Sequence, residues 1–197
     1  MKLQRIPKEI RGNVLRILLL TLSRGPLAVV FALLLLIPDQ TLPTLAASLA
    51  VLALIEITDM ADGFLARQLK AVTEWGAMLD PYADSVSRIV VYWGMAMAGL
   101  VLPAVPLVMA IRDVTVAYCR ITLSKKGRSV AANMSGKVKA WFQGVGAFLL
   151  VLGPYYWSHT GEWPRLALSW IVLLVTAASM VQYVSAAYSA AAEDWSD

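Results

Sequence analysis

Cysteine and histidine are almost absent from this sequence of 197 residues, which holds one of each, Cys119 and His159. A single cysteine cannot form a disulfide within the chain, and we interpret Cys119 as a small packing residue. His159 lies in a predicted outer loop without a partner in the sequence, so we assign it no role. The scarcity of both residue types also argues against zinc, which favours cysteine and histidine as ligands.

Charged residues are scarce as well. They make up 15% of the sequence, against roughly 25% in an ordinary soluble domain, and hydrophobic residues make up 59%. This composition predicts a membrane protein with a single domain over residues 1–197. The first apolar run is about 24 residues long, beyond the roughly 7–15 residues of a signal-peptide core, so we expect no cleaved leader.

Long apolar runs predict an all-α bundle of six transmembrane helices over residues 14–191, followed by a tail at 192–197. Most of the runs are long enough to cross about 30 Å of hydrocarbon as a helix. The third run contains Pro103 and Pro106 after Gly99, so we divide it there into two helices. The runs lie at residues 14–37, 43–58, 85–111, 141–157 and 166–191.

Lysine and arginine are distributed unevenly between the predicted loops. Thirteen lie in the N-terminal segment and after the second and fourth predicted helices, and one, Arg165, lies near the opposite side. Because short cytoplasmic loops collect positive charge, we expect a multi-pass protein of the cell (inner) membrane with both termini in the cytoplasm. The net charge of +4 then predicts contact with anionic membrane lipids and not with nucleic acid.

The N-terminal segment, residues 1–13, precedes the first predicted span. Leu3, Ile6, Ile10 and Val14 recur at helical spacing with basic residues between them. This pattern favours an amphipathic helix that lies on the cytoplasmic leaflet. A disordered basic tail is the alternative.

Four aspartates follow the second apolar run at set intervals. Asp59 and Asp62 are three residues apart, and Asp80 and Asp84 are four apart. On helices, each pair lies on one face, so two rows of carboxylates are expected to face each other. Four carboxylates held close together need bound cations or protons to neutralise them, and oxygen ligands without nitrogen or sulfur favour Mg²⁺ or Mn²⁺. A solvated acidic loop with helix-capping aspartates is the alternative.

Other residues of the stretch suit a phosphorylated ligand. Gly63 and Gly76 remove side chains beside the carboxylates, which would let a bulky ligand approach the backbone. Arg67 offers a fork of donors that matches phosphate oxygens. The whole stretch resembles the signature of the CDP-alcohol phosphatidyltransferases, with no position missing: Asp59, Asp62, Gly63, Ala66, Arg67, Gly76, Asp80 and Asp84.

The resemblance implies transfer of a phosphatidyl group from CDP-diacylglycerol to an alcohol, with release of CMP. It implies that Asp59, Asp62 and Asp80 bind metal, with two ions expected, and that Asp84 lies near the metals as a fourth ligand and as the general base. It implies a nucleotide site lined by Gly63, Ala66, Arg67 and Gly76. The family also suggests a homodimer.

A second basic group suggests the acceptor alcohol. Members of the family that make phosphatidylglycerophosphate carry an Arg-Glu pair, another arginine eight residues after the first, and then Gly-Lys-x-Lys-Thr. This chain resembles them with Asp113 in place of the glutamate and Ala140 in place of the threonine. The resemblance implies that sn-glycerol 3-phosphate is the acceptor, although inositol phosphate would also fit and serine would need such a site less. The residues expected to bind the acceptor phosphate are Arg112, Arg120, Lys137 and Lys139.

Two further charged positions lie inside predicted spans. Thr21 and Arg24 are expected to line a substrate cavity near the aspartates, and the alternative is that Arg24 extends back to the headgroups. Arg88 is expected to neutralise Asp84 or another carboxylate. Glu56 could support the metal site or pair with a basic residue.

A function of another class would use the same aspartates. In a divalent-cation transporter, they would bind the ion that is carried. That function predicts acidic residues through the full depth of the membrane, and the second and third predicted helices have none beyond their cytoplasmic third. The sequence therefore favours an enzyme whose site lies at the cytoplasmic face.

Overall fold

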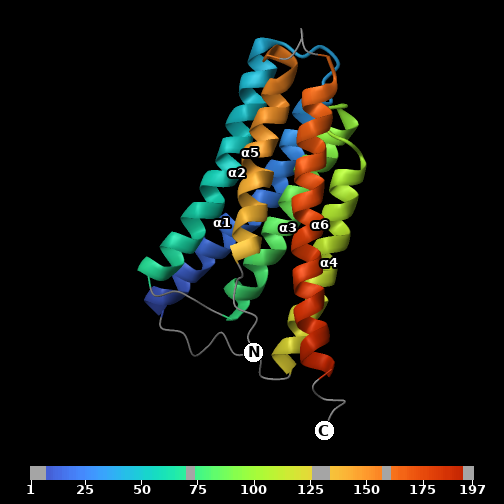
Figure 1. Ribbon diagram of the computed structural model, residues 1–197. Helices are drawn as coiled ribbons and strands as arrows, with labels where there is room; N and C mark the ends of the chain where they lie inside the picture. The colour runs from blue at the N-terminus through green and yellow to red at the C-terminus, as the bar shows by residue number, and fades with distance from the viewer. Residues whose placement is uncertain (1–7, 70–73, 126–133, 157–160, 193–197) are drawn as a thin grey trace. The chain divides into compact units, whose positions relative to one another are not determined.

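The computed structural model describes residues 8–69, 74–125, 134–156 and 161–192, and within these residues the fold is all-α (Figure 1). Six helices are present, as the apolar runs predicted. The helices are α1 (Lys8–Leu35), α2 (Leu42–Gln68), α3 (Glu74–Met97), α4 (Ala104–Lys125), α5 (Met134–Tyr156) and α6 (Trp163–Ala192).

Three of these helices are long and apolar enough to cross a membrane, among the residues that the structure describes. They are Gly12–Leu35 in α1, Leu42–Leu65 in α2 and Trp163–Ser189 in α6. Their outward faces carry large apolar side chains such as Leu19, Leu33 and Leu174, whereas an arginine, Arg24, is fully buried. A soluble protein shows the reverse distribution, so the pattern is that of a membrane protein.

The chain divides into two compact units, Met1–Gly94 and Met95–Asp197. In the first unit, α1 and α2 lie side by side and contain buried apolar residues such as Phe31 and Leu52 (Figure 1). Gly94 of α3 lies directly against α1, because a Cβ atom placed on it would be 2.6 Å from the Cβ of Ala32. The absent side chain therefore allows α3 to approach α1 closely.

Local hydrogen bonds explain where α1 ends and α2 begins. The side-chain amide of Gln40 lies within hydrogen-bond distance of the carbonyls of Leu34, Leu35 and Ile37, at and just after the end of α1, where carbonyls lack helical partners. The hydroxyl of Thr44 accepts from the backbone N–H of Thr41, and the hydroxyl of Thr41 accepts from the backbone N–H of Thr44, as in a capping box. Polar side chains thus satisfy the backbone groups of this turn.

In the second unit, α6 packs against both α4 and α5. Gly99, with a φ of 73°, ends α3, and the amide of Leu100 donates back to the carbonyl of Met95 at 2.8 Å. A glycine in this left-handed conformation is a common helix terminator. The predicted division of the third apolar run near Gly99 and Pro103 is therefore confirmed.

One face of α6 is polar and buried. Its residues recur at intervals of seven, three and four positions, which keeps them on one helical face, and each bonds a neighbouring segment. Ser169 accepts from the amide of Leu102, Thr176 from the side-chain amide of Gln143, and Ser179 from Arg112. Tyr183, four residues further on, contacts Arg120. We call Ser169, Thr176, Ser179 and Tyr183 the polar stripe of α6.

Several helices extend beyond the predicted apolar runs: α3 begins at Glu74, α4 ends at Lys125 and α5 begins at Met134. Helix α1 runs from Lys8 without a break, so the described part shows no separate element ending at residue 13, and residues 1–7 lie outside it. Helix α2 continues to Gln68, ten residues past the end of its apolar run, because Arg24 and Thr21 bind the aspartates of its last turns. The single domain predicted for residues 1–197 stays a prediction.

Candidate active site

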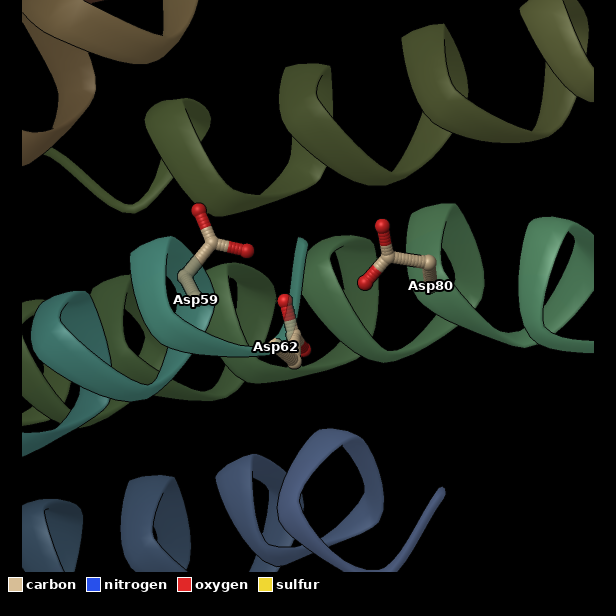
Figure 2. A group of neighbouring side chains, drawn as sticks. All are labelled: Asp59, Asp62 and Asp80. Carbon is tan, nitrogen blue, oxygen red and sulfur yellow. The ribbon is translucent and has the colours of Figure 1, made fainter. Parts of the chain in front are cut away.

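Three of the four predicted aspartates converge. Asp59 and Asp62 project from α2 and Asp80 from α3, and Figure 2 shows the carboxylates directed toward a common space. One carboxylate oxygen from each residue lies within 4.8 Å of the other two. Because Asp59 and Asp62 are three residues apart on one helix, they share a face, as the sequence predicted. This group could hold a metal ion.

Arg24 of α1 lies against all three carboxylates. Its guanidinium contacts Asp59, donates to Asp62 at 2.9 Å and donates to Asp80 at 2.7 Å. The hydroxyl of Thr21, one turn earlier, donates to the same oxygen of Asp62 at 2.9 Å. The Arg24 side chain is 0% exposed, so it points to the aspartates and does not extend to the headgroups. The predicted neighbourhood of Thr21, Arg24 and the aspartates is thus present, and their part in a substrate cavity stays a prediction.

Arg88 of α3 joins the remaining acidic residues to this group. Its Nε donates to Asp84 at 2.7 Å, and its two terminal nitrogens lie 3.2 and 3.4 Å from the carboxylate of Glu56. One of them is also 3.9 Å from Asp59. Arg88 therefore neutralises Asp84, as expected, and Glu56 pairs with a basic residue. Asp84 does not belong to the group of three, but Arg88 links it to that group.

The residues of this site fit a divalent cation. Five carboxylates, those of Glu56, Asp59, Asp62, Asp80 and Asp84, share two guanidinium groups, which leaves an excess of negative charge. The other oxygen of Asp62, Oδ1, is buried and has no hydrogen-bond partner among the described residues. A buried carboxylate oxygen without a partner is costly, and a cation would satisfy it. All the candidate ligands are oxygen atoms, which Mg²⁺ and Mn²⁺ prefer.

The predicted nucleotide residues are only partly described. Gly63 lies on α2 one residue after Asp62, and Gly76 lies on α3 one turn before Asp80. The side chains of Ala66 and Arg67 lie outside the described part of the structure. The assignment of these four residues to a nucleotide stays a prediction.

The second unit holds two of the predicted acceptor residues, Arg112 and Lys139, in a buried group. Arg112 of α4 donates to Asp113 at 2.7 Å and to the hydroxyl of Ser179 at 2.9 Å. Lys139 of α5 donates to the same oxygen of Asp113 at 3.2 Å. Arg112, Asp113 and Lys139 are all buried. Asp113 therefore stands between two cations that lie 27 positions apart in the sequence.

Arg120 reaches the same region of the second unit through Tyr183. Its guanidinium donates to the Tyr183 hydroxyl at 3.1 Å and lies over the ring, 5.3 Å from its centroid. Arg112 lies over the same ring at 5.5 Å. The structure thus brings together Arg112, Arg120 and Lys139, and the side chain of Lys137 lies outside the described residues.

Sequence reasoning assigned no role to Ser179 or Tyr183, although both contact predicted site residues. The signal that could have found them is the spacing of Ser169, Thr176, Ser179 and Tyr183, which lie on one face of a largely apolar helix. Polar side chains on one face of a membrane helix mark the face turned to the protein interior. Their partners on α4 and α5 required the structure.

The fold and site define a class of protein, an all-α membrane protein whose converging carboxylates form a site suited to a divalent cation. The sequence model of one family, CDP-alcohol phosphatidyltransferase, matches residues 18–186. The chain therefore belongs to the CDP-alcohol phosphatidyltransferase family and is a transferase.

Individual relatives cover most of the chain. An enzyme of Bacillus subtilis (strain 168) is 33% identical over 182 residues, which cover 84% of this chain and 91% of the relative. An enzyme of Escherichia coli (strain K12) is 34% identical over 175 residues, which cover 86% of this chain and 92% of the relative. Both are named CDP-diacylglycerol–glycerol-3-phosphate 3-phosphatidyltransferase.

Proposed function

We propose that this protein transfers the phosphatidyl group of CDP-diacylglycerol to sn-glycerol 3-phosphate, which gives phosphatidylglycerophosphate and CMP. The observation that carries the proposal is the similarity to two relatives named for this reaction, over more than four fifths of each chain. The convergence of Asp59, Asp62 and Asp80 supports it, because the reaction displaces one phosphate oxygen by another. Membership of an enzyme family argues against the divalent-cation transporter.

Asp84 is the proposed general base. The acceptor hydroxyl gives its proton to the Asp84 carboxylate while its oxygen bonds the phosphorus nearest the lipid, and the bond from that phosphorus to the CMP oxygen breaks. Arg88, which donates to Asp84 at 2.7 Å, orients the carboxylate. Mg²⁺ or Mn²⁺ ions held by Asp59, Asp62 and Asp80, with Asp84 as a further ligand, would supply positive charge that offsets the charge developing on CMP.

Other residues bind the two substrates. Gly63, Ala66, Arg67 and Gly76 line the nucleotide site, and Thr21 and Arg24 line the substrate cavity beside the aspartates. The acceptor phosphate binds the cationic group of the second unit, Arg112, Arg120, Lys137 and Lys139. Three of these four residues are brought together in the structure, which supports an anion as their ligand. The same group would accept inositol phosphate, whereas serine lacks the phosphate.

The proposed arrangement in the membrane follows the distribution of charge. All six helices span the membrane as one domain, with both termini in the cytoplasm and the active site at the cytoplasmic face of the inner membrane. Acyl chains then stay in the lipid while CMP and the water-soluble acceptor exchange with the cytoplasm. A homodimer is the proposed assembly.

The test measures CMP release by purified protein in detergent with CDP-diacylglycerol and Mg²⁺. Glycerol 3-phosphate, inositol phosphate and serine are supplied separately. We expect release with glycerol 3-phosphate, and a loss of roughly 10²–10⁴-fold in Asp84→Asn, the range that general-base catalysis contributes.

Asp39→Asn is the matched control for the Asp84 variant, because Asp39 is exposed in the turn between α1 and α2. It should retain full activity. Release with inositol phosphate or serine alone would reassign the acceptor. The absence of release with every acceptor, from protein that melts cooperatively, would refute the proposed reaction.

A further inference from the structure

Tyr183 of α6 is the residue that the two arginines of the second unit have in common. Arg112 and Arg120 lie eight positions apart on α4, about two helical turns, and both place their guanidinium groups over the Tyr183 ring. The Tyr183 side chain is large and 1% exposed, so its position is fixed by packing. The ring therefore offers a rigid surface shared by two arginine side chains.

The two arginines depend on this ring to different degrees. Arg112 is buried and also bonded to Asp113 and Ser179. Arg120 is exposed, and among the described residues it contacts Tyr183 through both the hydroxyl and the ring. An exposed arginine loses considerable rotamer freedom when it is fixed, and this loss opposes its use as a ligand unless another residue orients it in advance. Tyr183 can orient Arg120 in this way.

Holding two like charges against one ring is unfavourable unless something compensates for their repulsion. The negative face of the aromatic ring attracts each guanidinium, and the Tyr183 hydroxyl accepts one N–H from Arg120. The bond to Tyr183 uses one of the five N–H donors that an arginine carries, so others can reach a ligand. A phosphate group bound by both arginines would offset the remaining repulsion between their positive charges.

We propose that Tyr183 is a positioning residue that holds Arg112 and Arg120 in the arrangement that binds the phosphate of the acceptor. This inference rests on the proposed function, because it assumes that the cationic group binds a phosphorylated alcohol. Tyr183 does not itself contact the substrate. It acts through the two arginines, so its effect falls on the affinity for the acceptor and not on the chemical step.

The test compares Tyr183→Leu and Tyr183→Phe with the unmodified protein in steady-state CMP release. Leucine removes both the ring and the hydroxyl, and we expect the KM for glycerol 3-phosphate to rise roughly tenfold, which corresponds to about 1.4 kcal/mol. Phenylalanine keeps the ring and loses only the hydroxyl, so it should restore most of the affinity. The KM for CDP-diacylglycerol and the kcat should stay within about twofold of the unmodified values. Tyr188→Leu, at an exposed tyrosine of the same helix, is the matched control.

The outcomes separate positioning from a general loss of structure. Proportionate losses in both KM values and in kcat would assign Tyr183 a structural role and overturn the proposal, as would an unchanged KM for glycerol 3-phosphate. If Tyr183→Leu does not fold, Tyr183→Phe combined with Ser179→Ala removes one hydrogen bond from each arginine. A rise in the KM for glycerol 3-phosphate alone would then support the proposal, and an unchanged KM would overturn it. A failure of the proposed function differs visibly, because the unmodified protein would then release no CMP with glycerol 3-phosphate.

Discussion

In the first unit five carboxylates share two arginines. Among the described side chains of the second unit, Asp113 pairs with two cations, Arg112 and Lys139, and a third cation, Arg120, contacts Tyr183. Both groups include buried charges, such as Arg24 and Arg112, and a buried ion is costly unless an opposite charge compensates for it. Each group keeps an excess after its internal pairs are formed, and the excess has opposite sign in the two units. A cation could balance the excess of the first group, and the proposed acceptor phosphate would balance that of the second.

The cation requirement is tested most strongly at Arg24. Arg24→Gln removes the guanidinium that contacts Asp59, Asp62 and Asp80, so three carboxylates lose a shared partner. We expect the metal-free variant to lose about 3–5 kcal/mol of stability, the cost of breaking a buried ion pair. Thermal melting in detergent with and without Mn²⁺ measures this. The ion should stabilise the variant more than the unmodified protein, because it replaces the missing positive charge.

Arg16→Gln serves as the control, because Arg16 is an exposed arginine on the same helix. It should change the melting temperature little, both with and without Mn²⁺. If Mn²⁺ stabilises Arg24→Gln no more than it stabilises the unmodified protein, the carboxylates of the first unit do not share a cation. The contrast between a cation site in the first unit and an anion site in the second would then be wrong.

The anion requirement is tested at Lys139. Lys139→Met keeps the buried stem of the side chain and removes the charge that faces Asp113. The KM for glycerol 3-phosphate should rise roughly tenfold to a hundredfold, since a hydrogen bond to a charged group contributes about 1.5–3 kcal/mol. The KM for CDP-diacylglycerol should be nearly constant, and Lys139→Arg should recover part of the affinity. Equal changes in both KM values would contradict a role specific to the acceptor.

The sequence predicted the grouping of site residues more fully in the first unit than in the second, because residues of the first group lie close together in the sequence. Asp59 and Asp62 lie on one helical turn, so their shared face follows from helix geometry without a fold. Asp80 belongs to the next helix, and the resemblance to a family signature placed it with them. The pairing of Glu56 with Arg88 remained open, because 32 residues separate them and no periodicity relates two helices.

The second unit depends on contacts between distant helices. Arg112 and Arg120 share a face of α4 by their spacing of eight, but their common partner Tyr183 lies more than sixty residues later. Binary patterning identifies α6 as a membrane helix and does not say which helix its polar stripe meets. Helix α2 extends ten residues past its apolar run, and residues of α1 bond the aspartates in that extension.

The substitution with the smallest expected effect, Gly94→Ala, changes the geometry of the first unit without changing its charge. Arg24 of α1 can reach Asp80 of α3 only if the two helices are close, and Gly94 lies against Ala32 farther along the same pair of helices. Gly94→Ala places a Cβ 2.6 Å from the Ala32 Cβ, so one helix must move. Such overpacking costs about 1–3 kcal/mol. We expect a lower melting temperature together with weaker stabilisation by Mn²⁺.

Gly12→Ala separates this effect from a general effect of replacing glycine in a helix. An added Cβ at Gly12 meets no atom within 4 Å, so alanine should stabilise α1 slightly through its better helix propensity. The two substitutions are chemically identical and should have opposite signs. If Gly94→Ala lowers the melting temperature but leaves the Mn²⁺ effect unchanged, the spacing of α1 and α3 does not control the carboxylate group. Arg24 then follows the carboxylates when the helices move, because its long side chain can absorb a displacement of this size.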